Sequence, residues 1–455
     1  MPNKNKIKPV RRMCSWLGEK IFSGLIPSSY RSDSAALLTI LEWMLIGLLI
    51  RLFFMPISTH SDLLSVYGRA SLMAYQGWVA IPGLFGLFAH YIHAFFLLIF
   101  GPLLGPNYSE MFYWVLAGRF SASTTNWMEF IASPDIYLYR VLFLLKFPYL
   151  LFDFASAFLL LHIFSHNKKG GLTAFIFWMV NPVTIFVVYI FGRYESLAIF
   201  FILLSLFYAK KNKLSLALLM LGVSITIRIY PVILLLPFAL ILGKNVRQQV
   251  KLCFLGILPW LIMQIPSLIT TSSIPMVSAA TSSFGKTFFG LKFDFRFFDG
   301  IYVFVVGYFL LLFYTYFALN RSFKSAWKIC LLNLLFFFAV CYFHPQYFMW
   351  LMPLLVLQIV EDKRFIGLYV IQVFTLFVHT LHWDKSMSGQ LFMPINRVYF
   401  KYVPAIKTYI DKVYPGDQFI LIFRSILTAV CFFMIYLIIK SFTEKSRMQS
   451  NVFSG

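Results

Sequence analysis

The sequence predicts an all-α polytopic membrane protein, a bundle of about 12 transmembrane helices with amphipathic or re-entrant helices in its first outer loop. Hydrophobic residues make up 60% of the 455 positions and charged residues only 12%, a composition far outside that of soluble domains. Aromatic residues reach 20%, which suits spans and interfacial belts. Apolar runs of crossing length, roughly 17 to 25 residues, recur along the chain.

Six apolar runs are long enough to cross as single helices: 35–55, 137–163, 171–191, 251–270, 300–319 and 418–440. Four shorter runs are predicted as tilted or partly sunken spans: 195–209, 329–343, 347–360 and 365–382. The run 214–243 is too long for one helix and too short for two ordinary ones. It predicts a hairpin that breaks at Arg228 to Pro231, because proline disfavours helix continuation. Non-helical backbone at that depth is tolerated only where it lines a cavity.

The basic residues decide how these spans are oriented. Of the 39 Lys and Arg residues, 23 fall in seven short clusters between the apolar runs. Reading 84–105 as a re-entrant segment places all seven clusters on one side, as the positive-inside rule requires. This topology has both chain ends inside. The net charge of +22 is thereby explained by basic residues gathered on one side of the membrane, where they can also attract anionic lipid. Nucleic-acid binding is therefore disfavoured.

The chain is predicted to form one membrane domain. Residues 1–34 are a basic cytoplasmic N-terminal segment, 35–440 a single transmembrane domain, and 441–455 a cytoplasmic tail. Within the domain, 56–135 is the first extracytoplasmic loop region. We expect the first span to act as an uncleaved signal anchor. The five cysteines have neither metal-ligand spacing nor a disulfide pattern.

The predicted outer side collects the candidate site residues. Arg228 lies within an apolar run, and a cation at membrane depth costs roughly 2.5 to 3.5 kcal/mol, so it normally faces a wet cavity or a partner. Its planar fork can bind phosphate bidentately. The alternative is an arginine that snorkels near a helix end. Tyr230 follows it in the phrase Thr-Ile-Arg-Ile-Tyr-Pro.

Asp62 opens the first outer loop and is followed by an amphipathic helix that carries Tyr67 and Arg69. A carboxylate beside a cavity at the membrane surface can act as general base for a hydroxyl nucleophile. The competing interpretation is that Asp62 caps the helix that follows it.

Two further outer segments carry charged or polar groups at the start of a span. Arg193 and Glu195 stand in Gly-Arg-Tyr-Glu, where a local ion pair is the simpler interpretation. His344 and Gln346 stand in His-Pro-Gln-Tyr, where an aromatic belt with Pro at a helix start is the alternative.

Two acids lie inside apolar runs. Asp153 is expected to have a partner, such as Arg or Lys from a neighbouring helix, and Glu42 lies within the first span. Either acid could relay protons in a transporter, or belong to a structural buried pair.

The order of these motifs resembles the GT-C superfamily of polytopic glycosyltransferases. The resemblance is closest to the mannosyltransferase-like branch that includes the first mannosyltransferase of glycosylphosphatidylinositol synthesis and bacterial polyprenyl-phosphate-sugar-dependent enzymes. Five stretches carry it: Asp62 with Tyr67, Ala70 and Gly77; Lys146 to Asp153; Asn181-Pro182 with Gly192 to Glu195; Ile227 to Pro231; and His344 to Tyr347. The chain departs from the family pattern at Arg193, Glu195 and Arg228, where Gln, Asp and Lys are usual. Asp62 also stands alone where several relatives have an Asp-x-Asp pair.

The resemblance implies a GT-C-like fold and the inverting transfer of a sugar, with mannose the first expectation, from a polyprenyl- or dolichyl-phosphate donor to an acceptor hydroxyl. The acceptor would be a glycolipid, a glycan or a protein. Asp62 would be the catalytic base. The donor phosphate would be bound by Arg228, Arg193, Tyr230 and His344. The sugar or acceptor would be bound by Glu195, Tyr67, Arg69 and Gln346. The alternative role for Glu195 is to hold an arginine in place.

A lone carboxylate is a poor Mg²⁺ site, so neither a divalent metal nor another cofactor is expected. The membrane would be a bacterial inner membrane or that of the endoplasmic reticulum, with the site on its outer or lumenal side. A multi-pass transporter or lipid flippase remains the alternative, since discontinuous helices line transport sites. A membrane acyl- or phospho-transferase is a third possibility.

Overall fold

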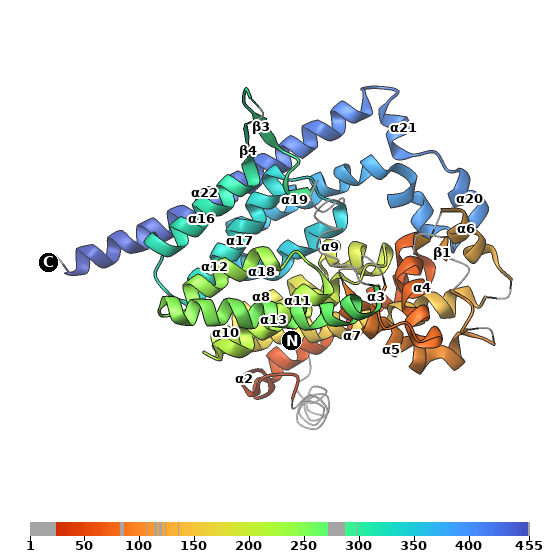
Figure 1. The fold of residues 1–455 in the computed structure, drawn as a ribbon, viewed down its shortest axis with the longest axis horizontal. Coiled ribbons are helices and arrows are strands. Elements are labelled where there is room, and N and C mark those ends of the chain that lie inside the picture. The colour runs from red at the N-terminus through yellow and green to blue at the C-terminus, as the bar shows by residue number, and fades with distance from the viewer. Residues whose placement is uncertain are drawn as a thin grey trace, which may run out of the picture.

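The computed structural model describes residues 24–81, 86–106, 108–112, 116–117, 121–122, 124–134, 136–271, 287–297 and 299–453. Its architecture is an all-α bundle, as the composition predicts (Figure 1). Most of the predicted N-terminal segment 1–34 lies outside the described residues.

The first half of the chain supplies these elements: α2 (Ser28–Arg31), α3 (Ser34–Ile57), α4 (Ser61–Gln76), α5 (Leu87–Leu104), β1 (Leu116–Ala117), β2 (Ser121–Ala122), α6 (Thr124–Ala132), α7 (Leu138–Ile163), α8 (Lys168–Met179), α9 (Pro182–Thr184), the π-helix η1 (Ile185–Ile190), α10 (Glu195–Lys210) and α11 (Leu214–Ile227). The strands β1 and β2 pair antiparallel.

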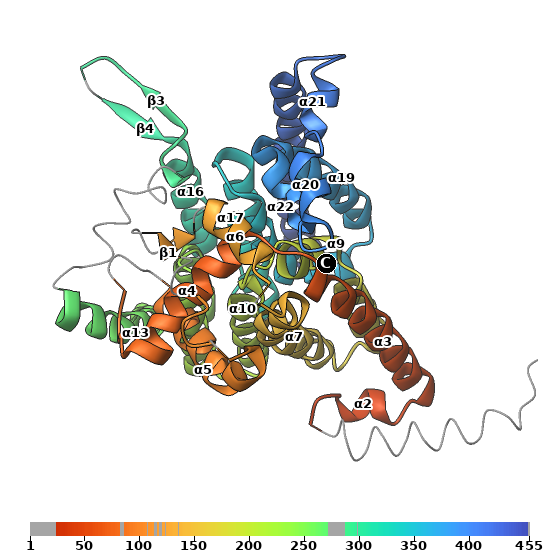
Figure 2. The same ribbon diagram turned by 90° about the vertical axis from the view of Figure 1, so that its right-hand side faces the viewer.

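The second half supplies the rest: α12 (Val232–Leu242), α13 (Val246–Thr271), β3 (Lys292–Asp294), β4 (Gly300–Tyr302), α16 (Val303–Ala318), α17 (Phe323–Val340), the 3₁₀ helix η2 (Pro345–Leu351), α18 (Met352–Glu361), α19 (Arg364–His379), the 3₁₀ helices η3 (Thr380–Met387) and η4 (Gly389–Phe392), α20 (Arg397–Tyr402), α21 (Ile406–Ile410) and α22 (Gly416–Phe453). The β3–β4 hairpin is antiparallel and projects away from the bundle (Figure 2).

Eight of the described helices are long and apolar enough to cross a membrane: α3, α5, α7, the segment from α8 through η1, α13, α17, the segment from α19 through η3, and α22. Three shorter apolar helices, α11, α12 and α16, accompany them. The fold is therefore that of an integral polytopic membrane protein. The count of about 12 crossings stays a prediction, and so does the re-entrant path of 84–105, because α5 by itself reaches crossing length.

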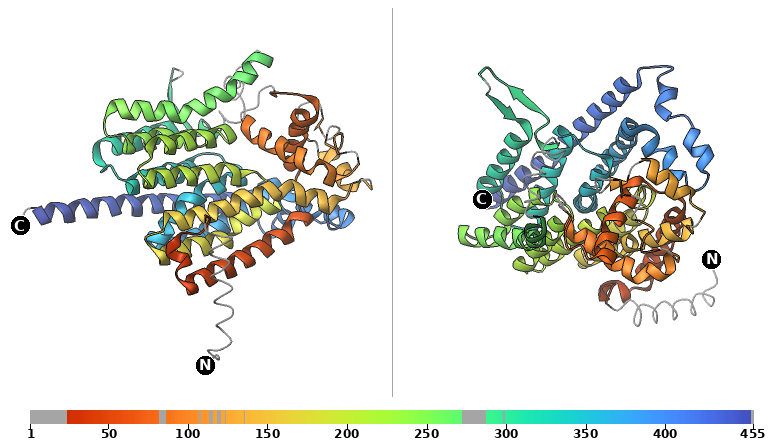
Figure 3. Two further views of the ribbon diagram at one scale, coloured as in Figure 1. Left: turned by 90° about the horizontal axis from the view of Figure 1, so that it is seen from below. Right: turned by 45° about the vertical axis from the view of Figure 1, so that its right-hand side comes forward.

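The predicted basic segments that fall within the described residues meet at one end of the bundle, which we call the basic end. Lys168 pairs with Asp33, and Lys210 donates to the carbonyl of Ile163. Arg321 donates to the carbonyl of Lys244 in the same way. Lys324 and Lys328 both bind Glu361, and Val360 lies against Gly170, which ties this group to the first. Figure 3 shows the long helices running side by side from this end toward α4 and α5.

Asp153 has the partner expected from its burial. Arg51 of α3 donates from Nε to Asp153 Oδ2 at 2.6 Å, and both side chains are fully buried. Trp178 and Tyr189 donate to the two carboxylate oxygens, each at 2.7 Å. Arg51 lies in α3, Asp153 in α7, Trp178 in α8 and Tyr189 in η1. This group of four side chains therefore fixes these elements against one another. Glu42, by contrast, is exposed on α3.

The predicted break in the run 214–243 is confirmed. Helix α11 ends at Ile227, Arg228 is extended with φ −138° and ψ 137°, and α12 begins after Pro231. Pro231 has the φ of −62° that its ring dictates. The break therefore turns the chain and presents Arg228 at the end of the bundle opposite the basic end.

Candidate functional site

Asp62 lies in the first turn of α4 but does not cap it. His60 is the N-cap residue, and its Nδ1 accepts the backbone N–H of Asp62 at 3.1 Å. The interpretation of Asp62 as the helix cap is therefore wrong, because His60 occupies the N-cap position and Asp62 already lies within the helix. The Asp62 carboxylate is left to interact with other side chains.

Arg193 binds that carboxylate directly, with 2.6 Å between Nη1 and Asp62 Oδ2. The Arg193 side chain is only 10% exposed, whereas that of Asp62 is 35% exposed, so a substrate can reach the carboxylate. The chain reaches Arg193 through the π-helix η1 and Gly192, which has a φ of +83°. Only glycine adopts that conformation without strain. Short π-helical segments such as η1 are frequent at functional sites.

The surrounding charges keep Asp62 ionised. Burial opposes its ionisation, but Arg193, with His60 and His344, lowers its pKa to about 2. Burial and the charge of Arg193 lower the pKa of His344 to about 3, and burial lowers that of His60. At neutral pH the site thus holds a carboxylate, a guanidinium and two neutral imidazoles.

A second ion pair stands beside the first. Arg228 donates to both oxygens of Glu195, from Nη2 to Oε1 at 2.5 Å and from Nε to Oε2 at 3.2 Å. Glu195 is fully buried at the start of α10 and also accepts from Trp350 Nε1 at 3.2 Å. Its carboxylate is therefore occupied, and its position holds Arg228 rather than offering an oxygen to a ligand. Arg228 remains 17% exposed.

Arg69 adds a third guanidinium from α4. It lies close enough to Arg193, Arg228 and Asp62 to be perturbed electrostatically by each, and burial lowers its pKa, although an arginine stays charged throughout. Its Nε has no hydrogen-bond partner among the described residues. The cluster of Arg69, Arg193 and Arg228 thus carries three positive charges against the two negative charges of Asp62 and Glu195.

Tyr194 lies at the centre of this cluster. The guanidinium carbon of Arg228 is 4.0 Å from its ring centroid and that of Arg193 is 5.6 Å away. Cations over an aromatic face are attracted by its quadrupole. A Cβ added to Gly86 would stand 3.6 Å from the Tyr194 hydroxyl and would clash with the carbonyl of Ile227. The segment before α5 therefore packs directly on the Arg228 turn.

His344 and Gln346 come from the other side of the bundle. The His344 ring stacks on Phe191 with 5.7 Å between centroids and meets Trp383 edge-on at 4.6 Å. His344 Nδ1 and Gln346 Oε1 are both buried and have no partner in the described part of the chain. Both side chains can therefore still bind a ligand group.

Tyr67 and Tyr230 lie in the packing behind the charged groups. The Tyr67 hydroxyl donates to the carbonyl of Leu145, and its ring meets His93 edge-on at 4.9 Å. Tyr230 is fully buried and stacks on Trp350 with 3.8 Å between centroids and 6° between planes. The two tyrosines support their neighbours in this conformation, so a ligand role for either stays a prediction.

Sequence reasoning gave no role to Trp350, Tyr194 or His60. Trp350 binds Glu195 and stacks between Tyr230 and Tyr347, the second ring at 4.1 Å. A Trp five residues after Pro345 offers no local signal of this contact, because its partners come from distant segments. Tyr194 belongs to the Gly-Arg-Tyr-Glu stretch and His60 lies two residues before Asp62, but neither local pattern indicates the contacts that the side chain makes.

The described residues contain no group of three or more His, Cys, Asp or Glu side chains that could hold a metal ion. Independence of a metal stays a prediction.

Two apolar grooves lie around α5 and flank Phe88. One, of about 240 Å³, runs between α5, α11 and α13 and reaches Thr226, two residues before Arg228. The other, of about 520 Å³, lies between α5, α7 and α10 and is lined by Phe95, Phe96 and Phe152 among others. Both can accept hydrocarbon.

Comparison with known proteins covers about a quarter of the chain. Residues 188–307, which contain Arg193, Glu195, Arg228 and Tyr230, match the family model described as Mannosyltransferase (PIG-M). The chain is 28% identical over 106 residues to GPI mannosyltransferase 1 of Saccharomyces cerevisiae. That alignment spans 23% of this chain and 26% of the yeast protein. No solved structure matches. The match confirms the resemblance inferred from the motifs: part of the chain is similar to the mannosyltransferase family model and to the yeast GPI mannosyltransferase.

Proposed function

We propose that this protein is an inverting membrane glycosyltransferase that moves a hexose, with mannose the first candidate, from a polyprenyl- or dolichyl-phosphate sugar to an acceptor hydroxyl on the extracytoplasmic or lumenal face. The observation that carries the proposal is the cluster of three arginines around Tyr194, which holds one more positive charge than the two carboxylates neutralise. A phosphate monoester or diester is the ligand that such a cluster favours.

Arg228 has the geometry of a fixed phosphate ligand. Glu195 and Trp350 hold it in place. As the bond between the anomeric carbon and the phosphate oxygen breaks, negative charge develops on the leaving polyprenyl phosphate. A preorganised cation stabilises that charge most in the transition state, which raises the rate of the chemical step. Arg69, with its unpartnered Nε, is placed to add a second cation.

Asp62 would take the proton of the acceptor hydroxyl as its oxygen attacks the anomeric carbon. With Arg193 bound, a pKa of about 2 makes Asp62 a weak base. A donor phosphate that competes for Arg193 removes this stabilisation, and burial then raises the pKa of Asp62. Donor binding would thus prepare the base for the acceptor, and no metal ion enters this sequence.

The lipid part of the donor is supported by the groove that reaches Thr226. Its apolar lining starts beside the Arg228 turn, so a phosphate on Arg228 would have a path for its hydrocarbon chain. The transporter alternative loses support, because Asp153 is held by Arg51, Trp178 and Tyr189 and is not free to relay protons.

The test is a transfer assay on membranes that contain the full-length chain. Radiolabelled polyprenyl- and dolichyl-phosphate mannose, the corresponding glucose lipids and the nucleotide sugar would be compared as donors. We expect label to reach the acceptor from a lipid-phosphate sugar only, and an α-linked product from a β-linked donor, checked with linkage-specific mannosidases. Transfer from the nucleotide sugar alone, or equal transfer by Arg228→Ala and the wild type, would contradict the proposal.

A further inference from the structure

Lys146 is a fully buried cation of α7 to which the proposed mechanism gives no role. Its Nζ donates to the carbonyl oxygens of Ser58 at 2.5 Å and of Tyr189 at 2.7 Å. It also donates to the hydroxyl oxygen of Ser58 at 3.2 Å, because that hydroxyl directs its own proton to the carbonyl of Phe54 or of Tyr189. A protonated lysine has three donor hydrogens and no acceptor. The three oxygens therefore match the ammonium form of Lys146.

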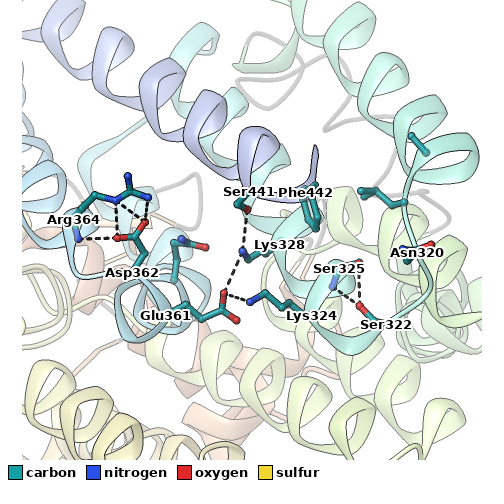
Figure 4. Close-up of a pocket in the computed structure, with 13 residues that line it drawn as sticks. Asn320, Ser322, Lys324, Ser325, Lys328, Glu361, Asp362, Arg364, Ser441 and Phe442 are labelled. Atoms are coloured by element: carbon teal, nitrogen blue, oxygen red, sulfur yellow. Dashed lines mark hydrogen bonds and ion pairs between the residues drawn. The ribbon is translucent and has the colours of Figure 1, made fainter. Parts of the chain in front are cut away.

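The acceptors of Lys146 are all uncharged, which sets it apart from the buried lysine at the basic end. A buried charge is costly unless it is paired and hydrogen-bonded. Lys328, only 3% exposed, has the usual arrangement: it binds the carboxylate of Glu361 at 3.2 Å and the hydroxyl of Ser441 at 3.3 Å (Figure 4). The charge of Lys146 is instead compensated by the two chain segments that present their carbonyls to it.

Both carbonyls belong to the ends of helices. Ser58 is the C-cap residue of α3, and Tyr189 lies in the last turn of η1. The last carbonyls of a helix have no donor within it, and the negative end of the helix dipole favours a cation there. One ammonium group thus stabilises two helix ends and ties them together.

These two helix ends lead directly into the candidate site. Ser58 precedes Asp62 by four residues, and Tyr189 precedes Arg193 by four residues. The segments that carry the two partners of the Asp62–Arg193 ion pair are therefore joined a second time, beneath that pair, by Lys146.

Further contacts of α7 make this second link rigid. Asp153, two turns after Lys146, accepts from the Tyr189 hydroxyl at 2.7 Å, so α7 holds both the backbone and the side chain of Tyr189. A Cβ added to Gly192 would stand 3.5 Å from Lys146 Cε and 3.4 Å from the side chain of Leu63. The turn that delivers Arg193 thus packs on the stem of Lys146.

We propose that Lys146 is a positioning residue of the glycosyltransferase, which fixes Asp62 relative to Arg193 by binding the two chain segments that carry them. The inference rests on the proposed function, in which the donor phosphate displaces Asp62 from Arg193. Once that ion pair is open, its two side chains no longer hold each other, whereas Lys146 still joins their backbone segments. The catalytic base thereby keeps its place while the phosphate occupies Arg193.

The experiment is a double-mutant cycle in membranes that contain the full-length chain, with Lys146→Met and Asp62→Asn alone and together. Lys146→Met removes the ammonium and keeps a side chain of similar length. At saturating donor we expect Lys146→Met to lower kcat, per folded protein, about 10²-fold, the cost of a misplaced catalytic group. In the Asp62→Asn background the further loss should be at most about tenfold, because residues that act as a unit are not additive. Equal losses in the two backgrounds, or a wild-type kcat in Lys146→Met, would overturn the proposal.

Lys328→Met is the matched control, since it also removes a buried lysine while Lys324 still pairs with Glu361. It should leave kcat unchanged, and a loss as large as that of Lys146→Met would overturn the assignment.

Ser58→Ala decides the question if Lys146→Met does not fold, because it removes one acceptor of Lys146 and leaves the ammonium with two carbonyls. We expect kcat to fall about threefold to tenfold, the range for one hydrogen bond, and to fall less when Asp62→Asn is also present. The same loss in both backgrounds would contradict the positioning role.

Hydrogen exchange gives a measurement that needs no donor. The backbone N–H of Arg193 donates to the carbonyl of Val187 at 3.0 Å. In Lys146→Met, peptides that contain this amide should exchange about tenfold faster, because the local structure opens more readily, whereas Lys328→Met should exchange as the wild type does. Unchanged exchange in Lys146→Met would overturn the positioning role. A wild-type protein that transfers no lipid-phosphate sugar would instead count against the proposed function alone.

Discussion

Arg193 and Asp62 form an ion pair of 2.6 Å that joins the loop after the π-helix to the first turn of α4. The pair brings together a carboxylate that keeps 35% of its surface and a guanidinium that is almost buried. It is also an exchangeable pair, since an anionic ligand can compete for Arg193. On the proposed function, a donor phosphate would displace Asp62 from Arg193 before the acceptor binds.

Asp62→Asn should lower transfer by a factor of about 10² to 10⁴, because the amide cannot accept the acceptor proton. The substitution keeps the size of the side chain and frees Arg193 from its ion pair, so donor affinity should not fall. Initial rates at saturating donor measure the loss. Asp294→Asn, in the exposed β3–β4 hairpin, is the matched control and should retain full activity. Equal rates in the two variants would remove Asp62 from the mechanism.

Glu195→Ala should destabilise the protein more than Asp62→Asn does. Removing one partner of a buried pair costs about 3 to 5 kcal/mol, because it leaves an uncompensated charge, and Glu195 is fully buried against Arg228. Asp62 is 35% exposed, and the amide oxygen that Asp62→Asn keeps can still accept a hydrogen bond from Arg193. Thermal unfolding in detergent gives the comparison. A Tm for Glu195→Ala at or above that of Asp62→Asn would show that Glu195 does not hold Arg228.

The sequence predicted the features that follow from local chemistry. Pro231 and the basic ends of the run 214–243 were sufficient to locate the turn at Arg228. The burial cost of Asp153 was sufficient to predict a cationic partner, and Arg51 is that partner. Each of these features depends on the cost of a polar group in an apolar run, which can be read from one segment.

The features that sequence reasoning missed depend on contacts between segments. Trp350 binds Glu195 from a distant part of the chain, and His60 replaces Asp62 as the cap of α4. Both aspartate and histidine can accept a backbone N–H, and only the backbone conformation at residue 60 decides between them. The sequence also could not show that the Glu195 carboxylate is occupied.

Asp153→Ala should lower stability by about 3 to 5 kcal/mol, because it leaves Arg51 charged and buried without its carboxylate. The double variant Arg51→Met with Asp153→Leu should recover much of that loss, since apolar groups of similar volume can replace a buried pair. Tm values of the wild type and the single and double variants make the measurement. A double variant that is less stable than Asp153→Ala would contradict this account.

The stability of the protein should fall as the pH drops below about 6.5, the ordinary pKa of histidine. The pKa of His344 is lowered to about 3 by burial and by Arg193, so the unfolded chain binds a proton in this range that the folded protein does not. His60 contributes in the same direction. His344→Gln should therefore show a smaller loss of Tm between pH 8 and pH 5. His166→Gln, which alters an exposed histidine at the basic end, should follow the wild type.

Gly192→Ala should reduce transfer more than it reduces stability. Gly192 has a φ of +83°, and a left-handed conformation costs other residues about 1 to 2 kcal/mol. The protein can relieve this strain by rotating the peptide that follows, which moves Arg193 away from Asp62. We therefore expect a rate loss of about tenfold or more, since small misplacements of reacting groups are costly, with a Tm lowered by only a few degrees. Gly367→Ala in α19, where an added Cβ meets nothing within 4 Å, is the control and should leave both quantities unchanged. A Gly192→Ala variant with reduced Tm and wild-type rate would show that the position of Arg193 does not matter for transfer.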